Sequence, residues 1–401
     1  MAKDWYDRAA GSYRELDTED AQTAVEKALQ LDPTREQVRL LAAQIALSQH
    51  DYPGTLKHTQ GLTSAEALGL QGRAHWYAGD LTAAADTLEQ LLADPQVRDP
   101  WADGVAKLAR RGAGRHPFTV RGVLLAVMEM PRFKTSAMVV PVELNGQPVL
   151  AMIDTGTAEV VIDSAGGRDP SWLSLRFGQL DRRVEVKDVP AVTRDLSGIS
   201  RELNAPIKLL LGTNLLRRLN PTIDALGRQF VVRTFEAPPP PVATKIDVQY
   251  VLGGGMLLRS KIGEDSSAED FALMIDTGMS FPLVLDENAW GRTRVDLSQR
   301  QPVAGAKGLS SARLPRVQLG AFVVPDVPAV SGFPLDKLEG VLGIELDGLL
   351  GSGLLGAFRV TLVDQGRSIW IEEGPRTPRP PATSGLATPP PSPAPAAPPA
   401  G

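Results

Sequence analysis

Two identical tripeptides, Asp154-Thr-Gly156 and Asp276-Thr-Gly278, are the residues of this chain best suited to do chemistry. Each tripeptide ends an apolar run that predicts a buried strand. Each is followed by a second short apolar run that ends on an acid, Asp163 in one copy and Asp286 in the other. Two carboxylates that meet at such junctions can share one proton, and such a pair can act as acid and base.

Other catalytic groups are scarce. The chain has no cysteine, which excludes a thiol nucleophile, a disulfide and a thiolate metal site. All of its histidines precede the first tripeptide: His50, His58, His75 and His116. A Ser-His-Asp triad or a histidine-ligated metal within the region of the tripeptides is therefore excluded. We expect no metal and no cofactor, and carboxylates must carry any chemistry there.

The repetition extends beyond the tripeptides. The segment Asp188-Val-Pro-Ala-Val192 recurs as Asp326-Val-Pro-Ala-Val330. The segment Leu210-Leu-Gly-Thr-Asn-Leu-Leu216 recurs as Leu349-Leu-Gly-Ser-Gly-Leu-Leu355. Three motifs in the same order at nearly equal spacing predict an internal duplication.

An apolar strand ending in Asp-Thr-Gly, a later Leu-Leu-Gly and strand-forming surroundings resemble one lobe of a retropepsin-like aspartic protease. The resemblance covers about residues 118–235 and again about 245–373, and two lobes in one chain resemble the pepsin plan. It implies a multidomain fold in which a helical region precedes two tandem all-β barrel lobes, related by a pseudo-twofold axis. Each lobe could instead pair with its copy in another chain. The short proline-rich joint at 236–244 favours pairing within one chain, because the effective concentration is high.

The resemblance implies a role for the first two residues of each tripeptide. Asp154 and Asp276 would form the catalytic dyad, in which one carboxylate activates a water and the other protonates or polarises the scissile carbonyl. No covalent intermediate forms in that mechanism. Thr155 and Thr277 would each cross to the backbone of the other lobe and lock the two loops together. The Leu-Leu-Gly elements would support the loops from behind.

The remaining loop residues fit the resemblance in part. Gly156 and Gly278 permit the tight turn and a close approach of the backbone to the dyad. The next residue is usually small in the family, and Thr157 fits. Met279 does not, although Ser280 follows it and could partly substitute. Met279 would either fill a substrate pocket or press on the loop.

The second lobe has a longer stretch between its active loop and its Asp-Val-Pro motif than the first lobe has. This stretch contains Val303-Ala-Gly-Ala-Lys-Gly-Leu309 and resembles the flap hairpin that covers substrate in the family. The candidate flap residues are Ala304, Gly305, Ala306, Lys307 and Gly308. The first lobe has only residues 164–172 in that place, so its flap is expected to be reduced or lost. Pepsin-like enzymes carry their flap on the first lobe.

Two functions of different classes fit the sequence. The favoured one is an aspartic endopeptidase that cleaves extended, mostly apolar segments of a peptide or protein substrate, with higher activity below neutral pH. The alternative is a catalytically weak peptide-binding or scaffold protein that kept the fold. Retention of both Asp and both Thr residues favours the enzyme. The missing first-lobe flap, Met279 and the helical region favour the alternative.

Residues 1–112 are expected to be helical and to form a separable unit. Apolar residues recur at helical spacing over residues 21–31, 37–48, 65–78 and 81–92. Gly79, Ala84, Leu88, Leu91 and Pro95 resemble a tetratricopeptide repeat; the alternative is an ordinary helical bundle. Residues 51–61 are too short and polar a stretch to predict a good second helix. A helical array would offer a surface to a protein partner.

The remaining segments carry little chemistry. Residues 374–401 are dominated by Pro, Ala, Ser and Thr and are predicted to be disordered. The arginine pairs at 182–183 and 217–218 are expected to be solvated, and Asp188 and Asp326 to shape turns.

Charge and hydropathy exclude two classes of partner. The net charge of −5 is mild and dispersed, which gives no nucleic-acid footprint. No apolar run is long enough to span a bilayer, and the N-terminal residues show no signal-peptide core. The sequence therefore predicts a cytoplasmic protein, or an exported one whose signal has been removed.

Overall fold

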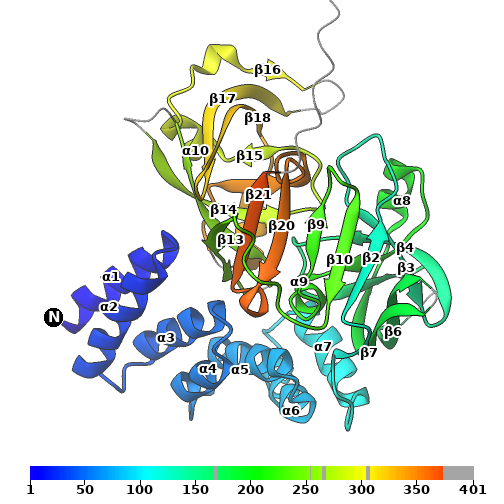
Figure 1. Ribbon diagram of the computed structural model, residues 1–401. Coiled ribbons are helices and arrows are strands. Elements are labelled where there is room, and N and C mark those ends of the chain that lie inside the picture. Colours follow the sequence, from blue (N-terminus) through cyan, green and yellow to red (C-terminus); the bar gives the residue numbers. More distant parts are fainter. Residues whose placement is uncertain are drawn as a thin grey trace, which may run out of the picture.

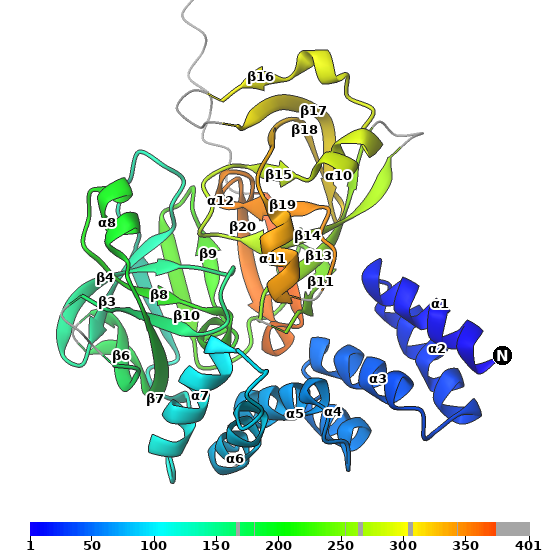
Figure 2. The same cartoon turned by 180° about the vertical axis from the view of Figure 1, so that it is seen from behind.

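The structure is a computed structural model that describes residues 1–373 except 166–168, 180, 253, 264–267, 304–307 and 343. Residues 374–401, predicted to be disordered, lie outside the described residues. A row of helices is followed by two β lobes that lie side by side, with the helices along one end of both lobes (Figure 1 and Figure 2). This arrangement confirms the predicted fold class.

Residues 1–112, all of which are described, form seven helices. They are α1 (Ala2–Arg14), α2 (Thr18–Leu31), α3 (Glu36–Ser48), α4 (Tyr52–Thr59), α5 (Ala65–Ala78), α6 (Leu81–Leu92) and α7 (Pro100–Arg111). Side chains at the N-caps of five of them accept a bond from a backbone N–H of the first turn: Asp17, Asp51, Ser64, Asp80 and Asp99. These caps explain why the helices begin where they do.

Helix α4 corrects one prediction, because residues 51–61 do contain a second helix. Asp51 caps it, and Pro53 lies in its first turn, where a missing N–H costs nothing. The hydroxyls of Thr55 and Thr59 bond to backbone carbonyls within the helix, which lets both polar side chains be buried. Local hydrogen bonding thus offsets the polar composition.

Each helix packs on the next along the chain. In addition, α3 contacts α5, and α5 contacts α7. Such neighbour and next-neighbour packing is typical of stacked helix pairs. Membership of the tetratricopeptide class stays a prediction.

The first lobe is a closed barrel. Its strands are β1 (Thr119–Gly122), β2 (Leu125–Glu129), β3 (Val139–Leu144), β4 (Gln147–Ile153), β5 (Val160–Asp163), β6 (Ser171–Gln179), β7 (Arg182–Arg194), β8 (Ile207–Leu211), β9 (Thr222–Asp224) and β10 (Gln229–Arg233), with helices α8 (Ser197–Leu203) and α9 (Thr213–Leu216). Within the described residues, the order β7-β5-β8-β4-β3-β6 closes on itself because β6 also pairs with β7.

The second lobe repeats this barrel. Its strands are β11 (Thr244–Asp247), β12 (Gln249–Tyr250), β13 (Met256–Ile262), β14 (Glu269–Asp276), β15 (Leu283–Leu285), β16 (Gln301–Pro302), β17 (Ser310–Leu319), β18 (Phe322–Ser331), β19 (Gly348–Gly351), β20 (Phe358–Val363) and β21 (Ser368–Glu373), with helices α10 (Glu287–Arg292), α11 (Leu335–Leu342) and α12 (Ser352–Leu355). Within the described residues, the ring β13-β14-β19-β15-β18-β17 closes through β13 and β17.

The pairing directions establish the predicted duplication. Strand β4 runs parallel to β8 as β14 does to β19, and β5 runs parallel to β7 as β15 does to β18. The same kink also recurs, because Asp188 and Asp326 both have positive φ, 52° and 57°. Both aspartates lie inside strands β7 and β18 and not in turns between strands, which corrects their predicted place.

A third sheet joins the lobes, in the order β11-β21-β20-β9-β10-β2 over the described residues. Strands β9 and β20 pair at its centre, where the hydroxyls of Thr222 and Thr361 lie 2.8 Å apart. The pseudo-twofold axis passes between these two threonines. A continuous apolar core that includes Phe230 and Phe271 runs through both lobes, so the lobes pair within one chain.

The helices contact the lobes at several points. The Trp172 indole donates to the backbone oxygen of Leu108, and Arg73 donates to that of Leu252. Gln249 donates to the backbone oxygen of Leu16 in the connection between α1 and α2. Within the described part of the chain, no helix is both long and apolar enough to cross a membrane.

Candidate active site

The two Asp-Thr-Gly loops meet where the lobes face each other. Loop one follows β4, and loop two begins at the last residue of β14. Both strands are almost entirely buried where they approach the loops, because each runs parallel to a second buried strand inside its barrel. The loops are therefore presented by rigid elements.

Reciprocal hydrogen bonds lock the loops together. The Thr155 hydroxyl donates to the backbone oxygen of Ile275 at 2.8 Å and accepts from the backbone N–H of Thr277 at 3.0 Å. The Thr277 hydroxyl donates to the backbone oxygen of Ile153 at 2.8 Å and accepts from the backbone N–H of Thr155 at 3.0 Å. Both threonines are buried. Each hydroxyl satisfies one donor and one acceptor of the opposite lobe.

The two aspartates face one small space. A Cβ placed on Gly156 would lie 2.8 Å from Oδ1 of Asp276 and 3.2 Å from Oδ1 of Asp154. A Cβ placed on Gly278 would lie 3.1 Å from Oδ1 of each aspartate. Any side chain at either glycine would therefore press on both carboxylates, which explains why glycine occupies both positions.

The glycines also hold the carboxylates in place. The backbone N–H of Gly156 donates to Oδ1 of Asp154 at 3.0 Å, and that of Gly278 donates to Oδ1 of Asp276 at 2.9 Å. The two bonds are related by the pseudo-twofold axis. They fix both Oδ1 atoms on the inner side of the pair.

Burial and mutual repulsion favour a proton on this pair. Burial first, and then the charge of Asp276, raise the pKa of Asp154 from 3.8 to about 7. Burial also raises the pKa of Asp276. Asp154 is only 8% exposed, whereas Asp276 is more accessible. Because the two groups interact, they titrate as a pair.

The Leu-Leu-Gly elements back the loops, as the resemblance implies. Gly212 directly follows strand β8, and a Cβ there would collide with the backbone oxygen of Glu159 at 2.2 Å. Strand β19 ends at Gly351, where a Cβ would collide with the backbone oxygen of Phe281 at 2.0 Å. Only glycine lets these strands pass so close behind the loops.

The residues after the glycines contribute backbone atoms. The Thr157 oxygen accepts from the backbone N–H of Thr213, and the Met279 oxygen accepts from Ser352. The Ser280 oxygen accepts from the Ser136 hydroxyl at 2.9 Å. Within the described residues, neither the Thr157 nor the Ser280 hydroxyl bonds to the carboxylate of Asp154 or Asp276. Ser280 thus ties the loop to its neighbours through its backbone.

The candidate flap is described only at its base. Strand β16 pairs with the start of β17, Gln301 with Ser311 and Pro302 with Ser310. Gly308 has φ of +86°, which suits a turn. The other candidate flap residues, 304–307, lie outside the described residues. The flap assignment therefore stays a prediction.

Sequence reasoning missed a residue of loop one. Glu159 is 4% exposed, and the indole N–H groups of Trp76 on α5 and Trp101 on α7 donate to its Oε1 at 3.1 and 3.2 Å. Asn214 donates to its Oε2. Helices α5 and α7 thereby hold in place the segment that directly follows the Asp-Thr-Gly tripeptide of loop one. No local motif of the sequence signals this contact.

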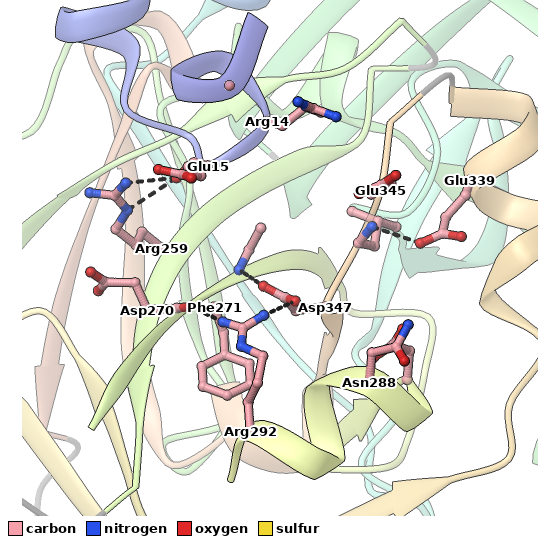
Figure 3. Close-up of a pocket in the computed structure, with 14 residues that line it drawn as sticks. Arg14, Glu15, Arg259, Asp270, Phe271, Asn288, Arg292, Glu339, Glu345 and Asp347 are labelled. Atoms are coloured by element: carbon pink, nitrogen blue, oxygen red, sulfur yellow. Dashed lines mark hydrogen bonds and ion pairs between the residues drawn. The ribbon is translucent and has the colours of Figure 1, made fainter. Parts of the chain in front are cut away.

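Other polar clusters lie away from the dyad. A cavity of about 680 Å³ on the second lobe is lined largely by charged residues (Figure 3). Among them, Arg292 pairs with the Asp347 carboxylate, and Arg259 donates to the backbone oxygen of Glu15. Neither Asp154 nor Asp276 lines it. No group of His, Cys, Asp and Glu side chains in the described part of the chain has the geometry to hold a metal ion.

Comparison with known proteins yields structural similarity alone. No protein-family model matches the chain, and no curated protein matches it. The chain is similar to a solved retropepsin-like aspartic protease from Rickettsia conorii, with 15% identity, 32% of this chain and 90% of that chain covered, and a TM-score of 0.25. It is also similar to the Basic 7S globulin from soybean, with 11% identity, 64% and 95% covered, and a TM-score of 0.42.

These similarities are too low to carry an argument about function. The fold rests on the strand order itself. Two closed barrels of the same topology, paired about a pseudo-twofold axis with their Asp-Thr-Gly loops crossed, form a retropepsin-like two-lobe fold.

Proposed function

We propose that the chain is an aspartic endopeptidase in which Asp154 and Asp276 form the catalytic dyad. The observation that carries the proposal is the shared space of the two carboxylates, held by the reciprocal bonds of Thr155 and Thr277. Because burial and the charge of Asp276 raise the pKa of Asp154, we expect the pair to retain one proton at acidic pH. An acid and a base are then present in one site.

We infer different roles for the two carboxyls because they differ in burial. Asp154 is the more buried and holds the proton, whereas Asp276 is the more accessible and ionised. Asp276 takes a proton from a water whose oxygen attacks the scissile carbonyl carbon. Asp154 gives its proton to the carbonyl oxygen. Asp276 then gives its proton to the amide nitrogen and the C–N bond breaks. A hydroxyl of the tetrahedral diol returns a proton to Asp154 as it becomes the new carboxyl group, so the dyad again holds one proton.

Apolar groups beside loop two favour an apolar substrate. Met279 and Phe281 pack against the apolar cluster that contains Val330 and Leu349. Val303 and Leu309, at the base of the β16–β17 hairpin, pack on the same cluster. Met279 in this view contributes to a substrate pocket.

The test is cleavage of an unbiased peptide mixture by the full chain between pH 3 and 8, read by mass spectrometry. We expect internal cleavages next to apolar residues, more of them below pH 7, and inhibition by a pepstatin-type compound that places a hydroxyl between the carboxyls. A folded protein that cleaves nothing over this range would contradict the proposal and favour a peptide-binding role.

A further inference from the structure

Within the described part of the chain, the two arginines that follow helix α9 of the first lobe, Arg217 and Arg218, form no ion pair. Arg217 is 4% exposed and Arg218 is half-buried. The Nε atoms of both are buried and have no hydrogen-bond partner. Arg217 has one long hydrogen bond, to the backbone oxygen of Tyr77 at 3.4 Å, and no ion pair to either arginine occurs within the described residues. The prediction that this pair is solvated was wrong for Arg217.

Burial of these guanidinium groups without a bound partner lowers the stability of the folded protein. A guanidinium loses its hydration when it is buried and requires charged or hydrogen-bonding partners in return. The Arg217 guanidinium lies 5.7 Å from the Tyr52 ring, which supplies only a weak cation–π contact. The Tyr52 hydroxyl lies beside Arg217 and, among the described residues, is itself buried without a hydrogen bond of normal geometry. A bound anion would accept hydrogen bonds from these donors and would neutralise the two positive charges.

Both arginines line a cavity of about 260 Å³ at the junction of the helices with lobe one, called here the junction cavity. Its wall consists of Trp76, Tyr77, Ala78, Gly79, His116, Pro117, Phe118, Asn214, Arg217 and Arg218. Ala78 and His116 are exposed, so the cavity opens to solvent on that side. This volume accommodates a phosphate ion or the end of a peptide.

The buried acid Glu159 interacts electrostatically with Arg217 but does not pair with it. Glu159 is oriented toward the indoles of Trp76 and Trp101 and toward Asn214. It forms no ion pair with Arg217 or Arg218 within the described residues. The guanidinium donors in the junction cavity are therefore left for a ligand.

We propose that the junction cavity binds a small oxyanion between the guanidinium groups of Arg217 and Arg218, either free phosphate or the terminal carboxylate of a peptide. Arginine suits both, because its planar fork matches phosphate and carboxylate geometry. The site lies at one end of α9, the helix that follows the Leu-Leu-Gly support of loop one. A bound oxyanion would therefore strengthen the contact between the helices and the first lobe.

The experiment is calorimetric and thermal titration of the full chain with inorganic phosphate, against sodium chloride of equal ionic strength. We expect saturable heat and a Tm that rises by several degrees with phosphate alone, since a ligand that binds only the folded state stabilises it. A parallel titration uses N-acetyl-dialanine and its C-terminal amide. A saturable response to inorganic phosphate identifies free phosphate as the ligand. A saturable response to N-acetyl-dialanine but not to its C-terminal amide identifies a peptide carboxylate.

Variants locate the effect. Arg217→Met and Arg218→Met should each remove the anion-dependent rise in Tm, whereas Arg313→Met, which alters an exposed arginine paired with Asp326, should retain it. In anion-free buffer Arg217→Met should melt at or above the wild-type temperature, because it removes an unpaired buried charge. If Arg217→Met does not fold, the Arg218→Met variant and the titrations of the wild-type protein test the proposal. No saturable response to phosphate or carboxylate, or an equal response in all variants, would overturn the proposal.

Discussion

At the residue scale, the buried Asp154 carboxyl makes stability depend on pH. Its pKa is 3.8 in the unfolded chain and about 7 in the folded protein, so the folded state binds the proton more tightly. This contribution to stability is complete below about pH 4 and is lost as pH rises through 7. The buried Asp154 carboxyl thus destabilises the folded protein at neutral pH.

Asp154→Asn should therefore stabilise the folded protein above pH 7 while removing activity. Each unit of pKa shift corresponds to about 1.4 kcal/mol, which gives a gain on the order of a few kcal/mol at pH 8 and almost none at pH 3.5. Urea unfolding at the two pH values measures the difference. A gain of equal size at both values would show that Asp154 is not protonated by burial.

The Thr155 hydroxyl is predicted to matter for both stability and turnover. Thr155→Val leaves a backbone oxygen of Ile275 and an N–H of Thr277 buried without partners, at about 1–3 kcal/mol for each group. Thr155→Ser keeps the hydroxyl and serves as the matched control. We expect a large loss of Tm and turnover in the valine variant alone. Indistinguishable variants would show that methyl packing, and not the lock, holds the loops.

The sequence allowed these residues to be identified because the tripeptide occurs twice in one setting. Sequence reasoning could not find the partners of Glu159, or the burial of Arg217. Both depend on helices α5 and α7 arriving from a distant part of the chain. Long-range contacts of this kind leave no local pattern.

At the element scale, helices α5 and α7 position the segment after loop one through Glu159. Trp76→Phe removes a donor to a buried carboxylate and should cost more stability at pH 8 than Trp172→Phe, which removes a donor to a neutral backbone oxygen. Thermal melting at pH 8 of both variants is the measurement. Equal losses of Tm in the two variants would mean that Trp76 stabilises the protein by packing and not by its hydrogen bond to Glu159.

The order of elements in the lobes was largely predictable, since strand, loop and Leu-Leu-Gly recur in both copies. Helix α4 was missed because its stability comes from the Asp51 cap and buried threonine hydroxyls, which composition does not reveal. The kinks at Asp188 and Asp326 were placed in turns because aspartate favours left-handed backbone there. In the structure the same preference bends strands instead.

At the scale of the whole molecule, the helices and lobes are tied at their junction. Arg111 donates to the backbone oxygen of Pro170, and Arg115 pairs with Asp188. Tyr77 and Arg73 both donate to Leu252 of the second lobe. The helices thus contact both lobes, although the sequence between residues 110 and 116 reads as a simple connector.

Limited proteolysis near Arg111–Arg115 should therefore nick the chain without releasing the helices. The two fragments should co-elute in size-exclusion chromatography and melt in one transition, because their contacts survive the cut. A helical fragment that elutes alone, with the lobes melting as before, would show that residues 1–112 form a separable unit.

The most direct test of the account is turnover of one fluorogenic peptide by Asp154→Asn, Asp276→Asn and a control, Asp286→Asn. Asp286 follows loop two but caps α10, and asparagine caps a helix equally well. The account predicts that each dyad variant loses about 10²- to 10⁴-fold or more in turnover at pH 5 while remaining folded. The control should keep wild-type turnover. Undiminished turnover in either dyad variant would contradict the assignment of Asp154 and Asp276 as a catalytic pair.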